Sequence, residues 1–208
     1  MRTTVITVGA AYAGAMRMSG VSLDSTAKQI VGFLPVLALG ALMVWDLWLW
    51  RIPGLPRVTH RPRIDGLWSA TLEPTDESHI PAGGNRGPIP AYLVITQSYW
   101  SLAVRQYTVE STSDSRAFFW ARRPGASWET VAFVYDNEPQ QKHQHRSPRH
   151  LGTCQFDPTE SSPTQMTGTY FTDRYTKGDM TLARVDRTRG HPSFAAAEAH
   201  ALAVTTRR

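Results

Sequence analysis

The most apolar part of the sequence is the run IVGFLPVLALGALMVWDLWLW, residues 30–50, which carries one charge, Asp46. A helix of this length reaches ~30 Å, the thickness of the hydrocarbon core of a bilayer. Tryptophans crowd its C-terminal end, as they do at membrane interfaces. A buried helix of a soluble protein is the alternative, but such helices rarely stay apolar on every face. The pattern therefore predicts a membrane span.

A shorter apolar run, residues 3–16, precedes it between Arg2 and Arg17. As a helix it would reach only ~21 Å, which is short for a span. It fits a short first span, an interfacial or re-entrant segment, or the core of a signal peptide. We favour a first span, because the polar loop 17–29 and the second run complete a helical hairpin. Residues 1–50 are thus expected to hold two transmembrane segments.

The charges indicate the orientation of this hairpin. Residues 51–63 contain four arginines and no acidic residue, and positive charge of this kind marks the cytoplasmic side of a span. Because a hairpin returns the chain to its starting side, both ends are expected in the cytoplasm. The single cysteine, Cys154, agrees with a reducing compartment.

Beyond the spans the pattern changes to strands. Three prolines make residues 51–63 an extended linker. In residues 127–135, Val131, Phe133 and Tyr135 share one face, as in a strand with one buried side. Runs rich in β-branched and aromatic residues predict eight strands, at 64–73, 91–97, 102–109, 116–122, 127–135, 151–156, 165–173 and 179–185. Tight turns are expected at 98–101, 124–125 and 177–179.

No convincing helical period occurs between residues 63 and 186. Eight short sequential strands indicate an all-β domain, either a sandwich or an up-and-down barrel. Eight strands close a barrel that can hold one small ligand, and closure removes exposed sheet edges. We therefore expect a minimal eight-stranded antiparallel β-barrel, lipocalin- or avidin-like, over residues 64–186. The tail 187–208 is alanine-rich, and Ser193 could cap a short helix there.

Composition adds limits on the chemistry. The formal charge of +5 is compatible with an anionic ligand or an anionic membrane surface. The sequence has no HExxH or CxxC motif, no nucleophile elbow and no phosphate loop, so we expect neither a metal site nor an enzyme. The loop 137–150 contains KHQHR, whose histidines fit a solvated basic rim better than a metal site.

Several short pieces, in order, carry a resemblance: IDGLW (64–68), VITQSYWSLAV (94–104), the hydroxyl series 108, 111, 113 and 115, FVYDNEP (133–139), HLGT (150–153) and GTYFTDRYTKGDM (168–180). Behind a two-span N-terminus, this order resembles the CD-NTase-associated membrane effectors of bacterial CBASS anti-phage systems. The resemblance implies a receptor whose barrel binds a cyclic oligonucleotide made by a partner nucleotidyltransferase. It further implies homo-oligomerisation, disruption of the inner membrane and cell death, with no DNA or RNA partner and no cofactor.

A pocket for such a ligand needs cations for phosphates and flat side chains for bases. The candidates are Arg105, Arg174 and Lys177 for charge, Trp100, Tyr135 and Tyr170 for stacking, and Thr108, Ser111, Ser113, Thr153 and Thr172 for hydrogen bonds. Each also has a structural interpretation: core tyrosines, an ordinary turn, and a local ion pair between Asp173 and Arg174. A carrier of lipid or another hydrophobic ligand, with a uniformly apolar pocket, and a purely structural subunit remain the alternatives.

Overall fold

The computed structural model describes residues 12, 14–15 and 25–206. The chain divides into two compact units, Met1–Trp50 and Arg51–Arg208. The first predicted span, residues 3–16, lies almost entirely outside the described residues.

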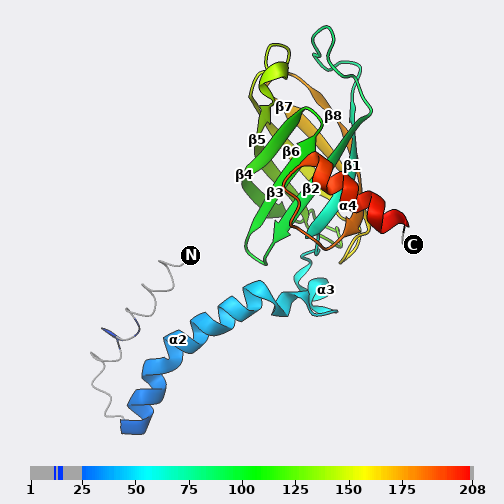
Figure 1. Ribbon diagram of the computed structural model, residues 1–208. Coiled ribbons are helices and arrows are strands. Elements are labelled where there is room, and N and C mark those ends of the chain that lie inside the picture. The colour runs from blue at the N-terminus through cyan, green and yellow to red at the C-terminus, as the bar shows by residue number, and fades with distance from the viewer. Residues whose placement is uncertain (1–11, 13, 16–24, 207–208) are drawn as a thin grey trace. The chain divides into compact units, whose positions relative to one another are not determined.

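Among the described residues of the N-terminal unit lies a long helix, α2 (Ser25–Leu47), and the 3-10 turn η1 (Leu49–Arg51) follows it (Figure 1). The apolar side chains of Phe33, Val36, Leu37 and Met43 are all exposed. Such exposure is typical of a helix whose natural surroundings are apolar. Within the described residues, Phe33–Arg51 is the one helical stretch long and apolar enough to cross a membrane. The second predicted run is thus confirmed as a candidate span.

The segment that leads into the barrel is not simply extended, and that prediction is wrong. It contains a short helix, α3 (Leu55–Thr59). Pro56 lies in its first turn, where a helix needs no backbone donor, so the proline starts the helix rather than breaking it. Gly54 (φ 99°) and His60 (φ 56°) bound the helix on either side.

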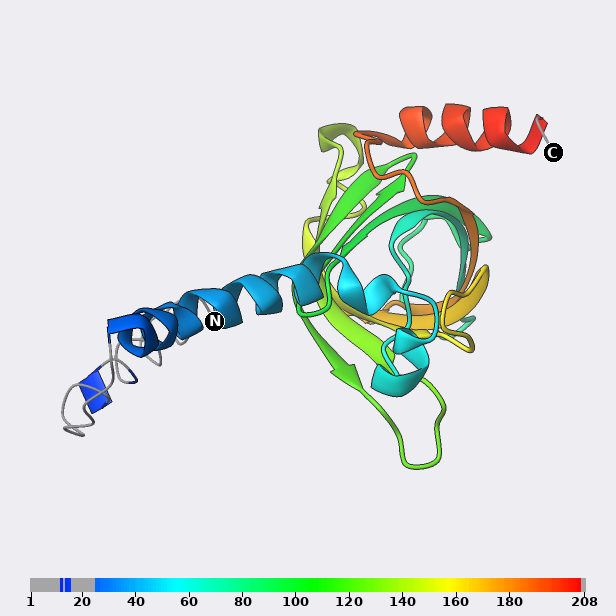
Figure 2. The same ribbon diagram turned by 90° about the horizontal axis from the view of Figure 1, so that it is seen from below.

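Eight antiparallel strands form a closed barrel in sequence order, with β8 pairing back to β1 (Figures 1 and 2). They are β1 (Gly66–Pro74), β2 (Ile89–Gln97), β3 (Leu102–Thr108), β4 (Ser111–Ala121), β5 (Thr130–Pro139), β6 (His150–Asp157), β7 (Gln165–Thr172) and β8 (Lys177–Asp186). The predicted eight-stranded barrel is confirmed.

Two of the three predicted turns are confirmed, at 98–101 and 124–125. The third is wrong, because residues 177–179 belong to β8 and the chain reverses just before them. There the amide of Tyr175 donates to the carbonyl of Thr172 (3.1 Å), and Tyr175 takes a left-handed φ of 62°. This position of the strand requires a glycine because the neighbouring backbone passes close to it. A Cβ added to Gly178 would lie 2.3 Å from the carbonyl oxygen of Glu73.

One end of the barrel is filled by the chain that enters it. Ile64 and Trp68 are fully buried there, and the indole of Trp68 donates to the carbonyl of Ile64 (2.8 Å). The buried amide of Gln97 accepts from the Ile64 N–H (2.8 Å) and donates to the carbonyl of Pro62 (2.9 Å). These bonds satisfy backbone groups that water cannot reach, so this end is plugged.

The tail forms α4 (Phe194–Thr206), which packs on the outer wall of the barrel (Figure 2). The hydroxyl of Ser193 accepts from the Ala196 N–H (3.2 Å), confirming the predicted cap. Buried Ala197 shares an apolar cluster with Leu67, Val94 and Tyr107 of the barrel wall.

Candidate functional site

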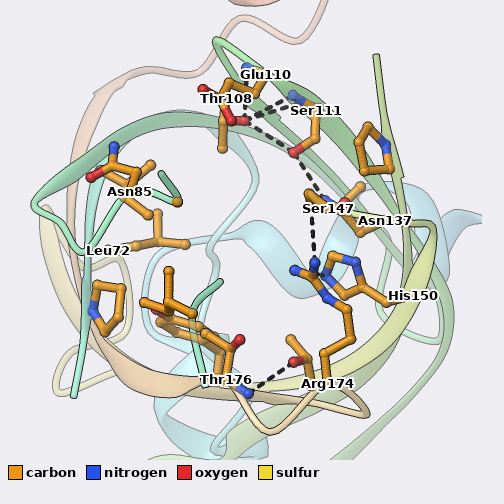
Figure 3. Close-up of a pocket in the computed structure, with 18 of the residues that line it drawn as sticks. Leu72, Asn85, Thr108, Glu110, Ser111, Asn137, Ser147, His150, Arg174 and Thr176 are labelled. Carbon is orange, nitrogen blue, oxygen red and sulfur yellow. Dashed lines mark hydrogen bonds between the residues drawn. The ribbon is translucent and has the colours of Figure 1, made fainter. Parts of the chain in front are cut away.

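The end of the barrel opposite the plug holds a cavity of about 470 Å³, within the usual size range of small-molecule sites. Loops β1–β2, β3–β4, β5–β6 and β7–β8 surround its mouth, and the labelled side chains line the ring of strands and loops (Figure 3). Its polar lining includes Asn85, Gln106, Thr108, Glu110, Ser111, Ser113, Tyr135, Asn137, Arg146, Ser147, His150, Tyr170, Thr172, Arg174 and Thr176.

Two tyrosines lie against the cavity wall because glycines face them on the next strand. Tyr135 pairs with Gly152, where an added Cβ would lie 2.3 Å from the tyrosine Cζ. Tyr170 pairs with Gly178, where an added Cβ would lie 2.8 Å from the phenol oxygen. Burial raises the pKa of Tyr170 to about 12 and raises that of Tyr135 as well. Both phenols therefore keep their protons and remain hydrogen-bond donors at neutral pH.

A network of hydroxyl and amide groups forms the side of the cavity near β3, β4 and β5. The Ser111 hydroxyl lies 3.0 Å from that of Thr108 and accepts from the Asn137 amide (3.0 Å). The same amide nitrogen donates to the hydroxyl of Ser113 (2.8 Å). Each of these groups keeps further donor or acceptor capacity, so this side can form hydrogen bonds to a polar ligand.

Arg174 brings a positive charge to the cavity from the β7–β8 turn. Its Nη1 donates to the Ser147 hydroxyl (3.1 Å), and its Nε, though buried, has no hydrogen-bond partner among the described residues. Among the described residues, no carboxylate forms a salt bridge with Arg174. The predicted local ion pair between Asp173 and Arg174 is therefore not formed. Burial lowers the pKa of this guanidinium, which stays charged because its ordinary value is so high.

His150 lies beside this guanidinium (Figure 3). Its Nδ1 is 3.0 Å from the carbonyl oxygen of Pro148, which can only accept, so Nδ1 carries the proton. Its Nε2 then presents a lone pair to Nη2 of Arg174 at 3.4 Å. Burial lowers the pKa of His150, and the charge of Arg174 lowers it further. The pair therefore holds one positive charge, on Arg174, and the unpartnered Nε of Arg174 is a donor that an anion could use.

A second arginine ties two loops together at the rim. Arg146 donates to the carbonyl of Gly83 in the β1–β2 loop (2.6 Å) and to the carboxylate of Glu110 in the β3–β4 turn (2.6 Å). Its charge is thus already balanced, in contrast to that of Arg174. Its role in this arrangement is to join three loops across the mouth.

Seven of the nine predicted site residues meet in the cavity: Thr108, Ser111, Ser113, Tyr135, Tyr170, Thr172 and Arg174. Arg105 and Thr153 occupy the outward positions of their strands, and Arg105 pairs with Asp114 there. Of the additional candidates, Lys177 is exposed and pairs with Glu77, and Trp100 lies in the β2–β3 turn at the plugged end. Ligand binding by any of these residues stays a prediction.

Several residues that line the cavity were not predicted from the sequence. Asn137 continues the inward alternation of Phe133 and Tyr135, and His150 shares the inward positions of β6 with Cys154, so strand periodicity could have found both. Arg146 and Ser147 belong to an irregular loop, where no periodicity applies.

A closed eight-stranded barrel that is plugged at one end and has a polar-lined cavity at the other can hold one small molecule. The model of one protein family, described as Cap15, cyclic dinucleotide receptor domain, matches residues 59–184. The match covers more than half of the chain and nearly the whole barrel, so the protein belongs to this family. It is therefore a CBASS effector that senses cyclic nucleotides. No curated protein matches the sequence.

Proposed function

We propose that the cavity around Arg174 is where the barrel binds its cyclic dinucleotide. The observation that carries this proposal is a half-buried guanidinium that lines the cavity, forms no salt bridge within the described residues, and has a buried Nε without a hydrogen-bond partner there. Leaving such a charge without a counterion is costly, and a phosphate removes the cost through charge-assisted hydrogen bonds.

The remaining groups have the chemistry that the other parts of the ligand require. Ser147 accepts a hydrogen bond from Arg174, and its own hydroxyl hydrogen can be donated to a phosphate. Tyr135 and Tyr170 offer ring surfaces on which bases can stack. The network of Thr108, Ser111, Ser113 and Asn137 can donate to and accept from base edges or ribose hydroxyls.

A carrier of lipids would need a largely apolar interior. The cavity does contain apolar side chains, such as Leu72 and Ile89, but charged and hydroxyl groups interrupt them around its circumference. Burying these groups against a hydrocarbon chain would leave them unpaired, at a cost of about 1–3 kcal/mol each. The lining thus favours the nucleotide.

Signalling rather than catalysis is the proposed outcome of binding. Binding of the ligand shifts the protein toward a homo-oligomer. For this, the ligand must bind the assembled state more tightly than the unassembled state. The apolar N-terminal helices then disrupt the inner membrane, with the barrel on the cytoplasmic side and two spans in each copy. Tethering to one plane raises the effective concentration of the copies and aids assembly.

Liposomes test this sequence of events. The full-length chain is reconstituted into vesicles that contain a self-quenching dye, and cyclic dinucleotides are added one at a time. One of them should release the dye and be recovered chemically unchanged. The compact fragment Arg51–Arg208 should bind the same nucleotide without releasing dye. Release by the fragment, or ligand turnover by the full chain, would contradict the proposal.

A further inference from the structure

Three potential metal ligands meet on the outer wall of the barrel, outside the residues that the family model matches. Asp186, His191 and His200 each offer one ligand atom, and these atoms lie within 4.8 Å of one another. We propose that they form a binding site for a divalent transition-metal ion, such as Zn²⁺, that fastens α4 to the barrel.

A bulge at the end of β8 directs the carboxylate to this place. Along β8, Met180 and Leu182 face the interior, so simple alternation would turn Asp186 inward too. The register shifts between Leu67 and Trp68, and Asp186 pairs with Leu67, whose side chain packs under α4. Because paired residues in a sheet share a face, the bulge brings Asp186 to the outer side. The bulge thus aims an acidic side chain at the helix.

The two histidines reach the carboxylate from different segments. His191 lies in the loop before the Ser193 cap, and His200 lies on α4, between the buried residues Ala197 and Ala201. The centroids of the two imidazole rings are 4.6 Å apart. The ligands thus come from a strand end, a loop and a helix, and a shared ion would join all three.

The spacing needs only a small adjustment for a metal. Zinc with ligands at about 2.0–2.1 Å in a tetrahedron places neighbouring ligand atoms roughly 3.4 Å apart. His200 Nε2 is already hydrogen-bonded to Asp186 Oδ2, and the Thr188 hydroxyl lies 2.8 Å from His191 Nε2 and 3.4 Å from His200 Nε2. Side-chain rotations that move the ligand atoms by about an ångström would make room for the ion between them. Two imidazoles and one carboxylate leave a fourth position for water or for the Thr188 hydroxyl.

The electrostatics of the cluster suit a cation. Asp186 brings a carboxylate to the cluster, and its two oxygens face the Thr188 hydroxyl and the imidazole of His200. An imidazole binds a metal in its neutral form, through the lone pair of a ring nitrogen. Two adjoining imidazoles are costly to protonate together, whereas one dication interacts favourably with both.

The test uses the full-length chain without a polyhistidine tag, stripped of metal and kept in detergent. Zn²⁺ is titrated by calorimetry, and Co²⁺ is added as a spectroscopic probe of tetrahedral geometry. We expect one equivalent of Zn²⁺ to bind and tetrahedral cobalt bands to appear. Asp186→Asn, His191→Gln and His200→Gln should each weaken Zn²⁺ binding by at least about tenfold. His143→Gln and His145→Gln, in a different loop, are the matched controls and should bind as the parent does.

Hydrogen exchange provides the readout for the fastening of α4. With Zn²⁺ present, the amides of α4 should exchange more slowly in the parent and at an unchanged rate in His200→Gln. Absence of stoichiometric binding, or binding that survives all three substitutions, would overturn the site. Binding that leaves the α4 exchange rates unchanged would overturn the role in fastening. None of these outcomes depends on the nucleotide cavity, so the two proposals fail independently.

Discussion

The phenol ring of Tyr135 lies across Gly152 of the neighbouring strand, in the space that any other residue's side chain would fill. Tyr170 and Gly178 repeat this relationship between β7 and β8, and Phe156 and Gly168 repeat it between β6 and β7, deeper in the barrel. In each pair the glycine lets the ring lie flat along the wall. The cavity is wide partly because the rings of Tyr135 and Tyr170, which line it, do not cross it.

Replacing Gly152 with alanine should therefore disturb the cavity. The new Cβ would lie 2.3 Å from Cζ of Tyr135, so the ring must swing into the space proposed for the ligand. We expect a loss of about 1–3 kcal/mol in the free energy of unfolding, typical of overpacking, together with weaker ligand binding. Chemical denaturation and calorimetry measure the two effects. Gly190→Ala, where an added Cβ meets nothing within 4 Å, is the control; equal effects in both variants would refute this explanation.

His150 should make the stability depend on pH. Burial and the charge of Arg174 lower its pKa in the folded chain, whereas in the unfolded chain it titrates near its ordinary value of 6.5. As the pH falls below about 6.5, His150 becomes protonated in the unfolded chain but stays neutral in the folded chain. The free energy of unfolding should therefore fall by up to about 1.4 kcal/mol per pH unit until the folded pKa is reached. Above about pH 6.5 this contribution is fully present.

His150→Asn tests that dependence, since its side-chain amide can still donate to the carbonyl of Pro148. Denaturation of the fragment Arg51–Arg208 at a series of pH values should give a shallower slope below pH 6.5 than the parent. His145→Asn, at an exposed histidine of the loop that precedes β6, is the matched control. An unaltered slope in His150→Asn would show that the acid sensitivity arises elsewhere.

Gln97 should be important for the plugged end. Its side chain satisfies the N–H of Ile64 and the carbonyl of Pro62, both in the buried interior. Gln97→Leu keeps the size but leaves both groups unpaired, so we expect the free energy of unfolding to fall by about 2–4 kcal/mol. Gln140→Ala removes an exposed amide at the opposite end and should change it by less than about 0.5 kcal/mol. A Gln97→Leu protein as stable as the parent would mean that water reaches this end.

The sequence predicted the barrel well because a strand has a period of two, and one buried face makes that period visible. The alternation of Val131, Phe133 and Tyr135 is the same in the structure as in the sequence pattern. The same period decides which site candidates reach the cavity. Arg105 carries the right charge, but its neighbour Val104 faces inward, so Arg105 faces outward.

Irregular segments were harder to predict. Gly178 was interpreted as a turn residue, but it lies in β8. A glycine is needed there because the backbone of Glu73 passes close to it. Pro56 was interpreted as a helix breaker, although it lies in the first turn of α3. Asp186, His191 and His200 are brought together by a bulge and a loop, neither of which has a periodic signal. In each case the deciding contact is tertiary.

The most direct measurement compares the melting of the full-length chain in detergent with that of Arg174→Ala, across a panel of cyclic dinucleotides. A ligand at 100 times its dissociation constant should stabilise the parent by about 2.7 kcal/mol. Removal of the guanidinium should weaken binding roughly 10- to 100-fold, the equivalent of one charge-assisted hydrogen bond. Arg149→Ala, which removes an outer arginine paired with Asp136, should melt as the parent does with ligand. The predicted result is a stabilisation of the parent that falls to about 0.4–1.4 kcal/mol in Arg174→Ala at the same ligand concentration. A panel without effect, or equal stabilisation of Arg174→Ala, would contradict the account.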